Sequence, residues 1–183
     1  MSEDLTRCFI CLEISREAID YFEELQGIIR KKNLFQGKYT EPENLHLTLK
    51  FLGEIEESKI GEVKKKLSEI KLPVFSVKLG SCGLFSKKSF RILWVKLLGE
   101  GIFNLQKEVD NKLGDLFPFE ERFMSHLTLA RIKKVFDRKI FLDYIKNVKT
   151  KKIEFRIVDF ILKKSELKPE GPIYTDIQRY SLL

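Results

Sequence analysis

The chain contains two histidines, and each begins the same tetrapeptide, His-Leu-Thr-Leu. The first copy starts at His46 and contains Thr48, and the second starts at His126 and contains Thr128. Alternate residues of a β-strand share one face, whereas residues two apart on a helix point in nearly opposite directions. Each tetrapeptide therefore predicts a strand with its histidine and threonine on one face and its leucines on the other.

Two imidazoles and two hydroxyls on neighbouring strands are suited to chemistry at a phosphodiester. An imidazole has an unperturbed pKa of about 6.5, so one ring can accept a proton while the other donates one. Threonine hydroxyls can donate hydrogen bonds to phosphoryl oxygens. The pattern predicts an in-line displacement in which one histidine activates the nucleophile and the other protonates the leaving oxygen.

A structural role and a metal site both fit the two motifs less well than catalysis. A single histidine in a strand is usually structural, but two matching copies that hold both histidines of the chain favour catalysis. A zinc site would need a third ligand at a motif spacing, so we predict no metal and no other cofactor. Cys8 and Cys11 have C-x-x-C spacing, but they lie in an apolar, strand-like run, which disfavours a redox pair or half of a zinc site.

The elements that must carry the motifs occur in two similar series, which indicates a duplicated unit. Each series is a strand, a helix, the His-Leu-Thr-Leu strand, a second helix and a further strand. In the first half we expect these at 7–14, 15–32, 44–55, 57–70 and 74–85, with Ser15 as the N-cap of the first helix. In the second half we expect them at 91–98, 101–117, 125–132, 137–148 and 151–164, followed by a final strand at 173–183.

The repeated series predicts an α+β fold in a single bilobal domain, residues 1–183. Two pseudo-symmetric lobes of mainly antiparallel sheet, with flanking helices, would enclose a central cleft. A pseudo-two-fold relation between the halves would bring the two motif strands side by side in that cleft.

The sequence resembles the two-histidine (2H) phosphoesterase superfamily, and within it the RNA 2′,3′-cyclic phosphodiesterases, also called 2′-5′ RNA ligases. The similarity covers nearly the whole chain, through the segments "RCFICLEI", "PENLHLTLKFLGEI", "FRILWVKL", "SHLTLARI" and "LKKSELKPEGPIY". It implies hydrolysis of a terminal 2′,3′-cyclic phosphate to a 2′-phosphate, with His126 as base and His46 as acid. Run in reverse with a ribose 5′-hydroxyl, the same site would join RNA ends through a 2′-5′ linkage.

The resemblance also suggests residues that bind the substrate. Thr48 and Thr128 occupy the threonine positions of the two family motifs. Arg131 matches an arginine that follows the second motif in many relatives, although strand alternation would turn it away from His126. By the same alternation Lys50 shares the face of the first motif and is a further candidate for contacting phosphate.

The charge of the chain favours RNA as the partner, and the resemblance implies RNA with 2′,3′-cyclic phosphate ends. The formal net charge is +7, from 34 Lys and Arg against 27 Asp and Glu, which suits a polyanion. Lys87 and Lys88, in a loop where relatives often carry proline, are candidates for steering RNA. Two alternatives stay open: a protein that binds RNA ends without catalysis, and a phosphodiesterase that acts on a small cyclic nucleotide.

The remaining features of the sequence indicate a cytoplasmic protein, and we expect it to act as a monomer. Apolar residues make up 43% of the chain, enough for a substantial core. No apolar run approaches the roughly 20 residues of a membrane span, so we expect no membrane association. The opening "MSEDLTRCFI" lacks the features of a signal peptide, and three cysteines do not make a secreted disulfide framework.

Overall fold

The computed structural model describes residues 5–85, 90–169 and 171–183, and these form two antiparallel sheets and four α-helices. The strands are β1 (Thr6–Glu13), β2 (Phe35–Tyr39), β3 (His46–Ile55), β4 (Phe75–Phe85), β5 (Ile92–Leu98), β6 (His126–Val135), β7 (Glu154–Ile157), β8 (Asp159–Lys168) and β9 (Gly171–Ser181). The helices are α1 (Arg16–Lys31), α2 (Glu57–Ser68), α3 (Glu100–Leu113) and α4 (Arg138–Asn147), and a short 3-10 turn spans Pro42–Asn44.

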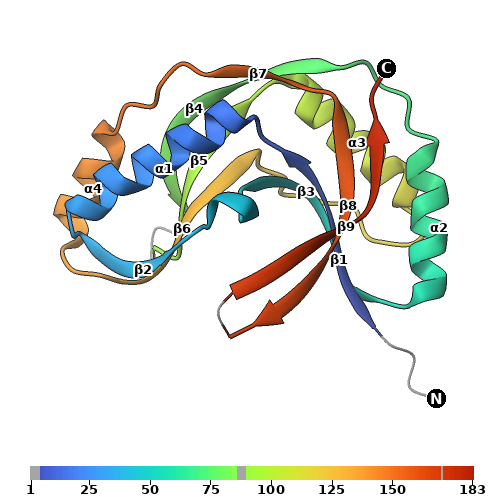
Figure 1. Ribbon diagram of the computed structural model, residues 1–183, viewed down its shortest axis with the longest axis horizontal. Helices are drawn as coiled ribbons and strands as arrows, with labels where there is room; N and C mark the ends of the chain where they lie inside the picture. Colours follow the sequence, from blue (N-terminus) through green and yellow to red (C-terminus); the bar gives the residue numbers. More distant parts are fainter. Residues whose placement is uncertain (1–4, 86–89, 170) are drawn as a thin grey trace.

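The two sheets each combine strands from both halves of the chain (Figure 1). The four-stranded sheet has the order β3-β1-β8-β9, and the five-stranded sheet has the order β2-β6-β5-β4-β7. The third strand of each series is thus exchanged: β4 pairs with β5, and β8 pairs with β1. The duplicated series therefore produces two interlocked lobes, because neither sheet can form from one half alone.

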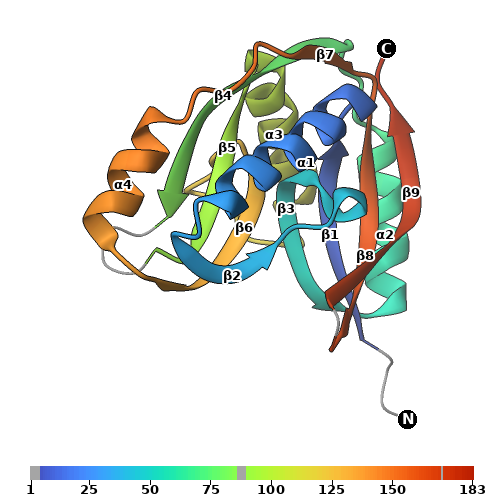
Figure 2. The same ribbon diagram turned by 60° about the vertical axis from the view of Figure 1, so that its left-hand side comes forward.

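The helices are distributed between the two sheets (Figures 1 and 2). Helices α1 and α4 lie on the five-stranded sheet, where Phe141 of α4 packs against Phe35 of β2. Helices α2 and α3 contact each other beside the four-stranded sheet, α3 against β3 and α2 against β9. None of the helices in the described part of the chain is both long and apolar enough to cross a membrane.

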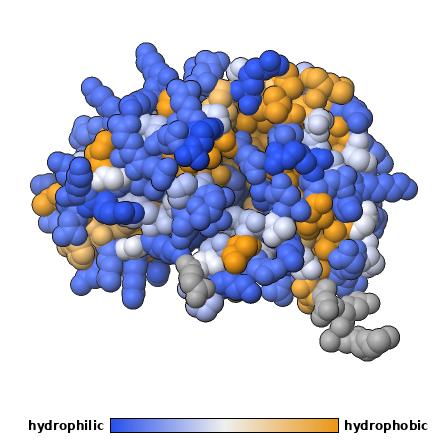
Figure 3. All heavy atoms as spheres, in the orientation of Figure 1, coloured by the Kyte–Doolittle hydropathy of each residue, from blue (hydrophilic) through white to orange (hydrophobic). Residues whose placement is uncertain are grey.

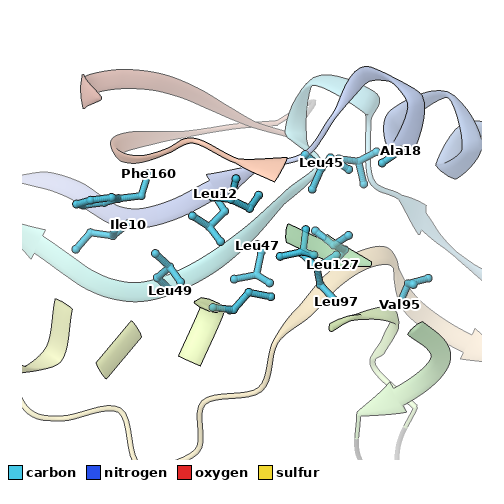
Figure 4. Packing of buried hydrophobic residues seen from close by; sticks show 14 of the residues in the cluster. Ile10, Leu12, Ala18, Leu45, Leu47, Leu49, Val95, Leu97, Leu127 and Phe160 are labelled. Atoms are coloured by element: carbon cyan, nitrogen blue, oxygen red, sulfur yellow. The ribbon is translucent and has the colours of Figure 1, made fainter. Parts of the chain in front are cut away.

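The leucines of the two motifs lie in one hydrophobic core between the sheets. Leu47 and Leu49 of β3, and Leu127 and Leu129 of β6, are each at most 1% exposed. Figure 4 shows Leu47 and Leu127 facing the same packed interior. The predicted assignment of the leucines to the buried face is therefore confirmed, and the histidines and threonines lie on the opposite face of each strand.

The predicted α+β fold is confirmed, and most predicted elements occur close to their expected positions. The Ser15 side chain caps α1 by accepting a hydrogen bond from the Ala18 N–H over 3.2 Å.

Two predictions of strands were incomplete. Strand β2 was missed, because it is short, mostly exposed and interrupted by Gly37. The expected strand 151–164 is two strands, β7 and β8, which belong to different sheets. Lys87 and Lys88 lie outside the described residues.

Candidate active site

The two motif strands lie next to each other, one at the edge of the four-stranded sheet and one in the five-stranded sheet. Each histidine is the first residue of its strand, and both are half-buried. A cleft of about 660 Å³ is lined by His46, Thr48, His126, Thr128 and Arg131. The structure thus brings together five of the six side chains that the sequence suggested for the site.

The walls of the cleft come from segments far apart in the sequence. One wall is the end of the β8–β9 hairpin, which projects from the body in Figure 1 and supplies Ser165, Leu167 and Tyr174. A second wall is β2 with the turn that follows it, including Lys38. The cleft therefore lies where both sheets, β2 and the hairpin meet.

Both imidazoles are held in the same orientation by the backbone. His46 Nδ1 lies 2.8 Å from the carbonyl oxygen of Asn44, and His126 Nδ1 lies 2.7 Å from that of Met124. A carbonyl oxygen can only accept, so each Nδ1 carries a hydrogen and donates it. In the neutral ring, Nε2 is then the basic nitrogen, and it is the atom left for chemistry in the cleft.

Thr48 completes the first motif through its hydroxyl. Its Oγ1 lies 3.1 Å from His46 Nε2. Because Nδ1 of this ring already carries the hydrogen, the Thr48 hydroxyl donates to the Nε2 lone pair. A phosphoryl oxygen in the cleft could replace that nitrogen as the acceptor, which would leave His46 free to exchange a proton.

Aromatic rings surround both imidazoles. Phe9 and Tyr174 pack against His46 with ring centroids 5.0 and 5.1 Å away. Phe85 packs edge-on against His126 with a centroid distance of 4.8 Å. These rings cover part of each imidazole, and the reduced contact with water makes its protonation sensitive to a bound anion.

The enclosure of the imidazoles lowers the pKa of both histidines. Burial lowers the pKa of His46 to about 4, against the opposing hydrogen bond to Asn44, and the positive charges of Lys163, of Arg131 and of His126 when it is protonated contribute to the decrease. Burial also lowers the pKa of His126, with a contribution from Arg131. The hydrogen bond that His126 makes to the backbone opposes that decrease. Both rings are therefore neutral near pH 7 in the free protein.

A β-bulge in each motif strand decides which later residues reach the cleft. In β6, Thr128 pairs with Trp94 and Ala130 with Leu93, so Leu129 is an extra residue that has no partner in β5. The extra residue inverts the alternation beyond it. Arg131 therefore shares the face of His126 and lines the cleft, and the expectation that it points away is wrong.

The matching bulge in β3 has the opposite consequence for Lys50. Thr48 pairs with Cys11 and Lys50 with Ile10, so Leu49 is the extra residue. Lys50 turns into the interior, is 4% exposed and forms an ion pair with Asp110. The prediction that Lys50 shares the face of His46 is wrong, and the buried Lys50 does not reach the cleft to contact phosphate. Its neighbour Phe51, 64% exposed, lines the cleft instead.

Several residues that line the cleft were missed by the sequence reasoning. These are Arg7 and Phe51 from the four-stranded sheet, Lys38 from β2, and Tyr174 from β9. None of them belongs to a repeated local motif. A local pattern could not identify them, because only the pairing and register of the strands bring them to the cleft.

The cysteines and the histidines do not form a shared metal site. In the ranges 5–85, 90–169 and 171–183, no three side chains of His, Cys, Asp or Glu are placed to hold a metal ion. Cys8 and Cys11 are buried free thiols. Burial raises the pKa of Cys8 to about 11 and that of Cys11 to about 12, so both stay protonated near neutral pH.

Comparison with known proteins gives matches over almost the whole chain. The RNA 2′,3′-cyclic phosphodiesterase of Methanocaldococcus jannaschii is 31% identical over 177 residues, which cover 95% of this chain and 99% of the relative. The protein of the same name from Archaeoglobus fulgidus is 34% identical over 161 residues, which cover 85% and 90%.

Solved structures have the same fold. The crystal structure of TT0787 from Thermus thermophilus has a TM-score of 0.81 at 28% identity and covers 96% of this chain and 97% of its own. Escherichia coli LigT in its apo form has a TM-score of 0.79 with 99% of both chains covered, and at 21% identity this is a likeness of fold.

A family model described as LigT like phosphoesterase matches residues 12–94 and again residues 95–174. The two matched segments correspond to the two halves of the chain, and each contains one histidine motif. This chain therefore belongs to the family of LigT-like phosphoesterases.

Proposed function

We propose that this protein is an RNA 2′,3′-cyclic phosphodiesterase that hydrolyses a terminal 2′,3′-cyclic phosphate to a 2′-phosphate. The observation that carries the proposal is the pair of half-buried imidazoles, His46 and His126, in one cleft with Nδ1 of each bound to the backbone. The curated relatives carry the name of this activity over nearly the full length of the chain. RNA ends are the partner that this activity requires.

The reaction needs one proton to leave the nucleophile and one to reach the leaving oxygen. A water oxygen attacks phosphorus as one imidazole Nε2 takes the water proton. The bond between phosphorus and the ribose 3′ oxygen breaks, and the second imidazole, in its protonated form, gives its proton to that oxygen. The product keeps its phosphate on the 2′ oxygen, and the two histidines have exchanged protonation states.

The non-bridging oxygens of the phosphate would be held by Thr48, Thr128 and Arg131. The two hydroxyls can each donate one hydrogen bond, and the guanidinium can donate two in parallel to an anionic oxygen. All three side chains line the cleft with the histidines. Arg7 adds positive charge to its walls, which suits the backbone of the adjoining RNA, while the charge of Lys38 is paired with that of Glu41 in the same cleft.

The family resemblance and the surroundings of His46 favour different divisions of the acid and base roles between the two histidines. The resemblance assigns His126 as base and His46 as acid. Burial lowers the pKa of His46 to about 4, which disfavours the protonated form that an acid needs. The assignment to His46 therefore requires the bound phosphate anion to raise its pKa substantially.

We further propose that the protein is a single bilobal domain that acts as a monomer in the cytoplasm. One chain supplies both histidines, both threonines and Arg131, so the cleft needs no second copy. The exchange of β4 and β8 between the sheets supports a single domain, because each lobe depends on the other for a strand. The surface facing the viewer in Figure 3 is mostly hydrophilic.

The proposal is tested by incubating the purified protein with an oligoribonucleotide that ends in a 2′,3′-cyclic phosphate. We expect a 2′-phosphate as the sole product, identified by mass spectrometry and phosphorus NMR. A 3′-phosphate, or no product, would contradict the proposal. A parallel reaction with a mononucleoside 2′,3′-cyclic phosphate tests the small-substrate alternative, and we expect a lower kcat/KM there. A third reaction that adds an RNA with a 5′-hydroxyl tests the reverse joining reaction.

A further inference from the structure

Gln26 is a buried side chain of α1 that binds the second motif strand. It is 6% exposed, although an amide of this size is usually found at the surface. Its Nε2 donates to the carbonyl oxygen of Leu129 over 3.1 Å and to that of Thr40 over 2.8 Å. The backbone N–H of Thr40 donates to the same Leu129 oxygen over 3.0 Å. Gln26 therefore joins α1, the end of β2 and the centre of β6.

Leu129, the residue whose carbonyl oxygen Gln26 binds, is the extra residue of the bulge in β6. The extra residue has no partner in β5, so a slip of register at this point is opposed by the hydrogen bonds that its carbonyl oxygen accepts from the Thr40 N–H and from Gln26 Nε2. A slip that removed the bulge would return β6 to regular alternation and turn Arg131 away from the face of His126. The hydrogen bonds to the Leu129 oxygen therefore hold the feature that directs Arg131 into the cleft.

The first motif strand is also held beside its bulge by a helix from the opposite half of the chain, here through a side chain rather than through the carbonyl of the extra residue. Lys50, which follows the extra residue of the β3 bulge, is bound by Asp110 of α3. Asp110 in turn accepts a hydrogen bond from Gln106 Nε2 over 2.7 Å. Gln26 and Gln106 both follow a leucine in the helix that precedes a motif strand. Each half of the chain thus supplies a helix that fixes the bulge of the other half.

We propose that Gln26 is a positioning residue that fixes the bulge at Leu129 and so holds Arg131 in the cleft for the substrate phosphate. The inference rests on the proposed function only for the role of Arg131. The link from Gln26 to the direction of Arg131 is a property of the fold.

The test uses the near-isosteric variant Gln26→Met, which removes both donated hydrogen bonds and keeps the volume. We expect KM for cyclic-phosphate RNA to rise roughly tenfold with a smaller change in kcat, because a hydrogen bond to a charged group is lost. The slope of log binding constant against log salt concentration should become shallower by about 0.7, the value for one lost phosphate contact on a single strand.

A double variant separates positioning from a general effect on structure. Arg131→Ala alone should raise KM and flatten the salt slope, and Gln26→Met added to Arg131→Ala should change neither further. If the effects of the two substitutions on KM and on the salt slope add in the double variant, the proposal is overturned. A wild-type KM and salt slope in Gln26→Met would overturn it as well. If Gln26→Met does not fold, Gln26→Asn, whose shorter amide cannot reach both carbonyls, takes its place.

Val63→Ala serves as the matched control for lost stability. Val63 is a fully buried residue of α2, which covers the other sheet. The Val63→Ala variant should lower the urea midpoint and leave KM and the salt slope at their wild-type values.

A failure of the proposed function can be distinguished from a failure of this inference. If the proposed function is wrong, wild-type protein will open no cyclic phosphate. The salt slope of equilibrium RNA binding will still report whether Gln26→Met removes the Arg131 contact.

Discussion

Lys50 and Asp110 form an ion pair buried between β3 and α3, with side chains 4% and 5% exposed. Lys50 Nζ also donates to the Pro118 carbonyl oxygen over 2.6 Å, and Asp110 accepts from the Glu120 N–H over 3.0 Å. The pair thus connects the strand of His46 to the segment that leads toward the second motif. Lys50, two residues after Thr48, is therefore a structural residue of this fold.

Lys50→Met is expected to reduce stability without weakening RNA binding by the folded protein. Removing one partner of a buried ion pair leaves the other charge uncompensated, at a cost of about 3–5 kcal/mol. Urea unfolding measures that loss, and Lys50→Met/Asp110→Leu should recover part of it. The salt dependence of RNA binding should equal that of wild type. A shallower salt slope in Lys50→Met would restore the phosphate contact that the structure argues against.

His46→Ala and His126→Ala should each reduce turnover by at least about 10². RNA affinity should change little, because Arg131 and the lysines and arginines around the cleft, rather than the neutral imidazoles, supply the charge that binds phosphate. Single-turnover kinetics and fluorescence anisotropy measure the two quantities separately. Wild-type protein that binds cyclic-phosphate RNA tightly but never opens the ring would support the alternative of a non-catalytic RNA-end binder.

The roles of the two histidines can be separated with a leaving group that needs no protonation. A nitrophenyl phosphodiester releases a stabilised phenolate, so loss of the acid matters little with this substrate while loss of the base still does. With His126 as base and His46 as acid, we expect the substrate to rescue His46→Ala and not His126→Ala. The reverse pattern of rescue would assign His46 as the base, in agreement with its low pKa in the free protein.

The pH profile of kcat/KM should be bell-shaped with its maximum below pH 6.5. The productive state has one neutral and one protonated imidazole, and kcat/KM reports the free protein. Burial lowers the pKa of His46 from 6.5 to about 4 and also lowers that of His126. The rate should therefore fall above pH 6.5, as the last proton is lost, and fall again toward pH 4, as the base becomes protonated.

The profile of kcat itself should lie at higher pH than that of kcat/KM. Bound phosphate stabilises the imidazolium form and so raises both pKa values in the complex. Stopped-flow measurements at saturating RNA give this profile. Profiles that coincide would contradict an effect of bound phosphate on the two pKa values. A rate independent of pH from 5 to 9 with chemistry limiting would contradict acid–base catalysis by this pair.

Activity should persist in the presence of a strong chelator. The two imidazoles can perform both proton transfers, and the hydroxyls and Arg131 can hold the phosphate oxygens. The measurement is the rate of ring opening after prolonged dialysis against EDTA, with a metal-dependent nuclease as the control for chelation. Activity that vanishes and returns with one divalent ion would refute this prediction.

The sequence by itself determined the features that depend on neighbouring residues. The two tetrapeptides predict strands with His and Thr opposite Leu, and the structure buries the leucines and lines one cleft with the remaining four side chains. The duplicated order of elements, the cap at Ser15 and the α+β class followed from local periodicity and end signals. These features are local because side-chain alternation and capping involve residues a few positions apart.

The tertiary structure decided every feature that depends on which strands pair. The bulges at Leu49 and Leu129 arise from register with β1 and β5, and they exchange the expected directions of Lys50 and Arg131. The exchange of β4 and β8 between sheets, and the arrival of Tyr174 beside His46, likewise require contacts between distant segments. Local alternation cannot encode a shift of register, because an extra residue is defined only by the partner strand that skips it.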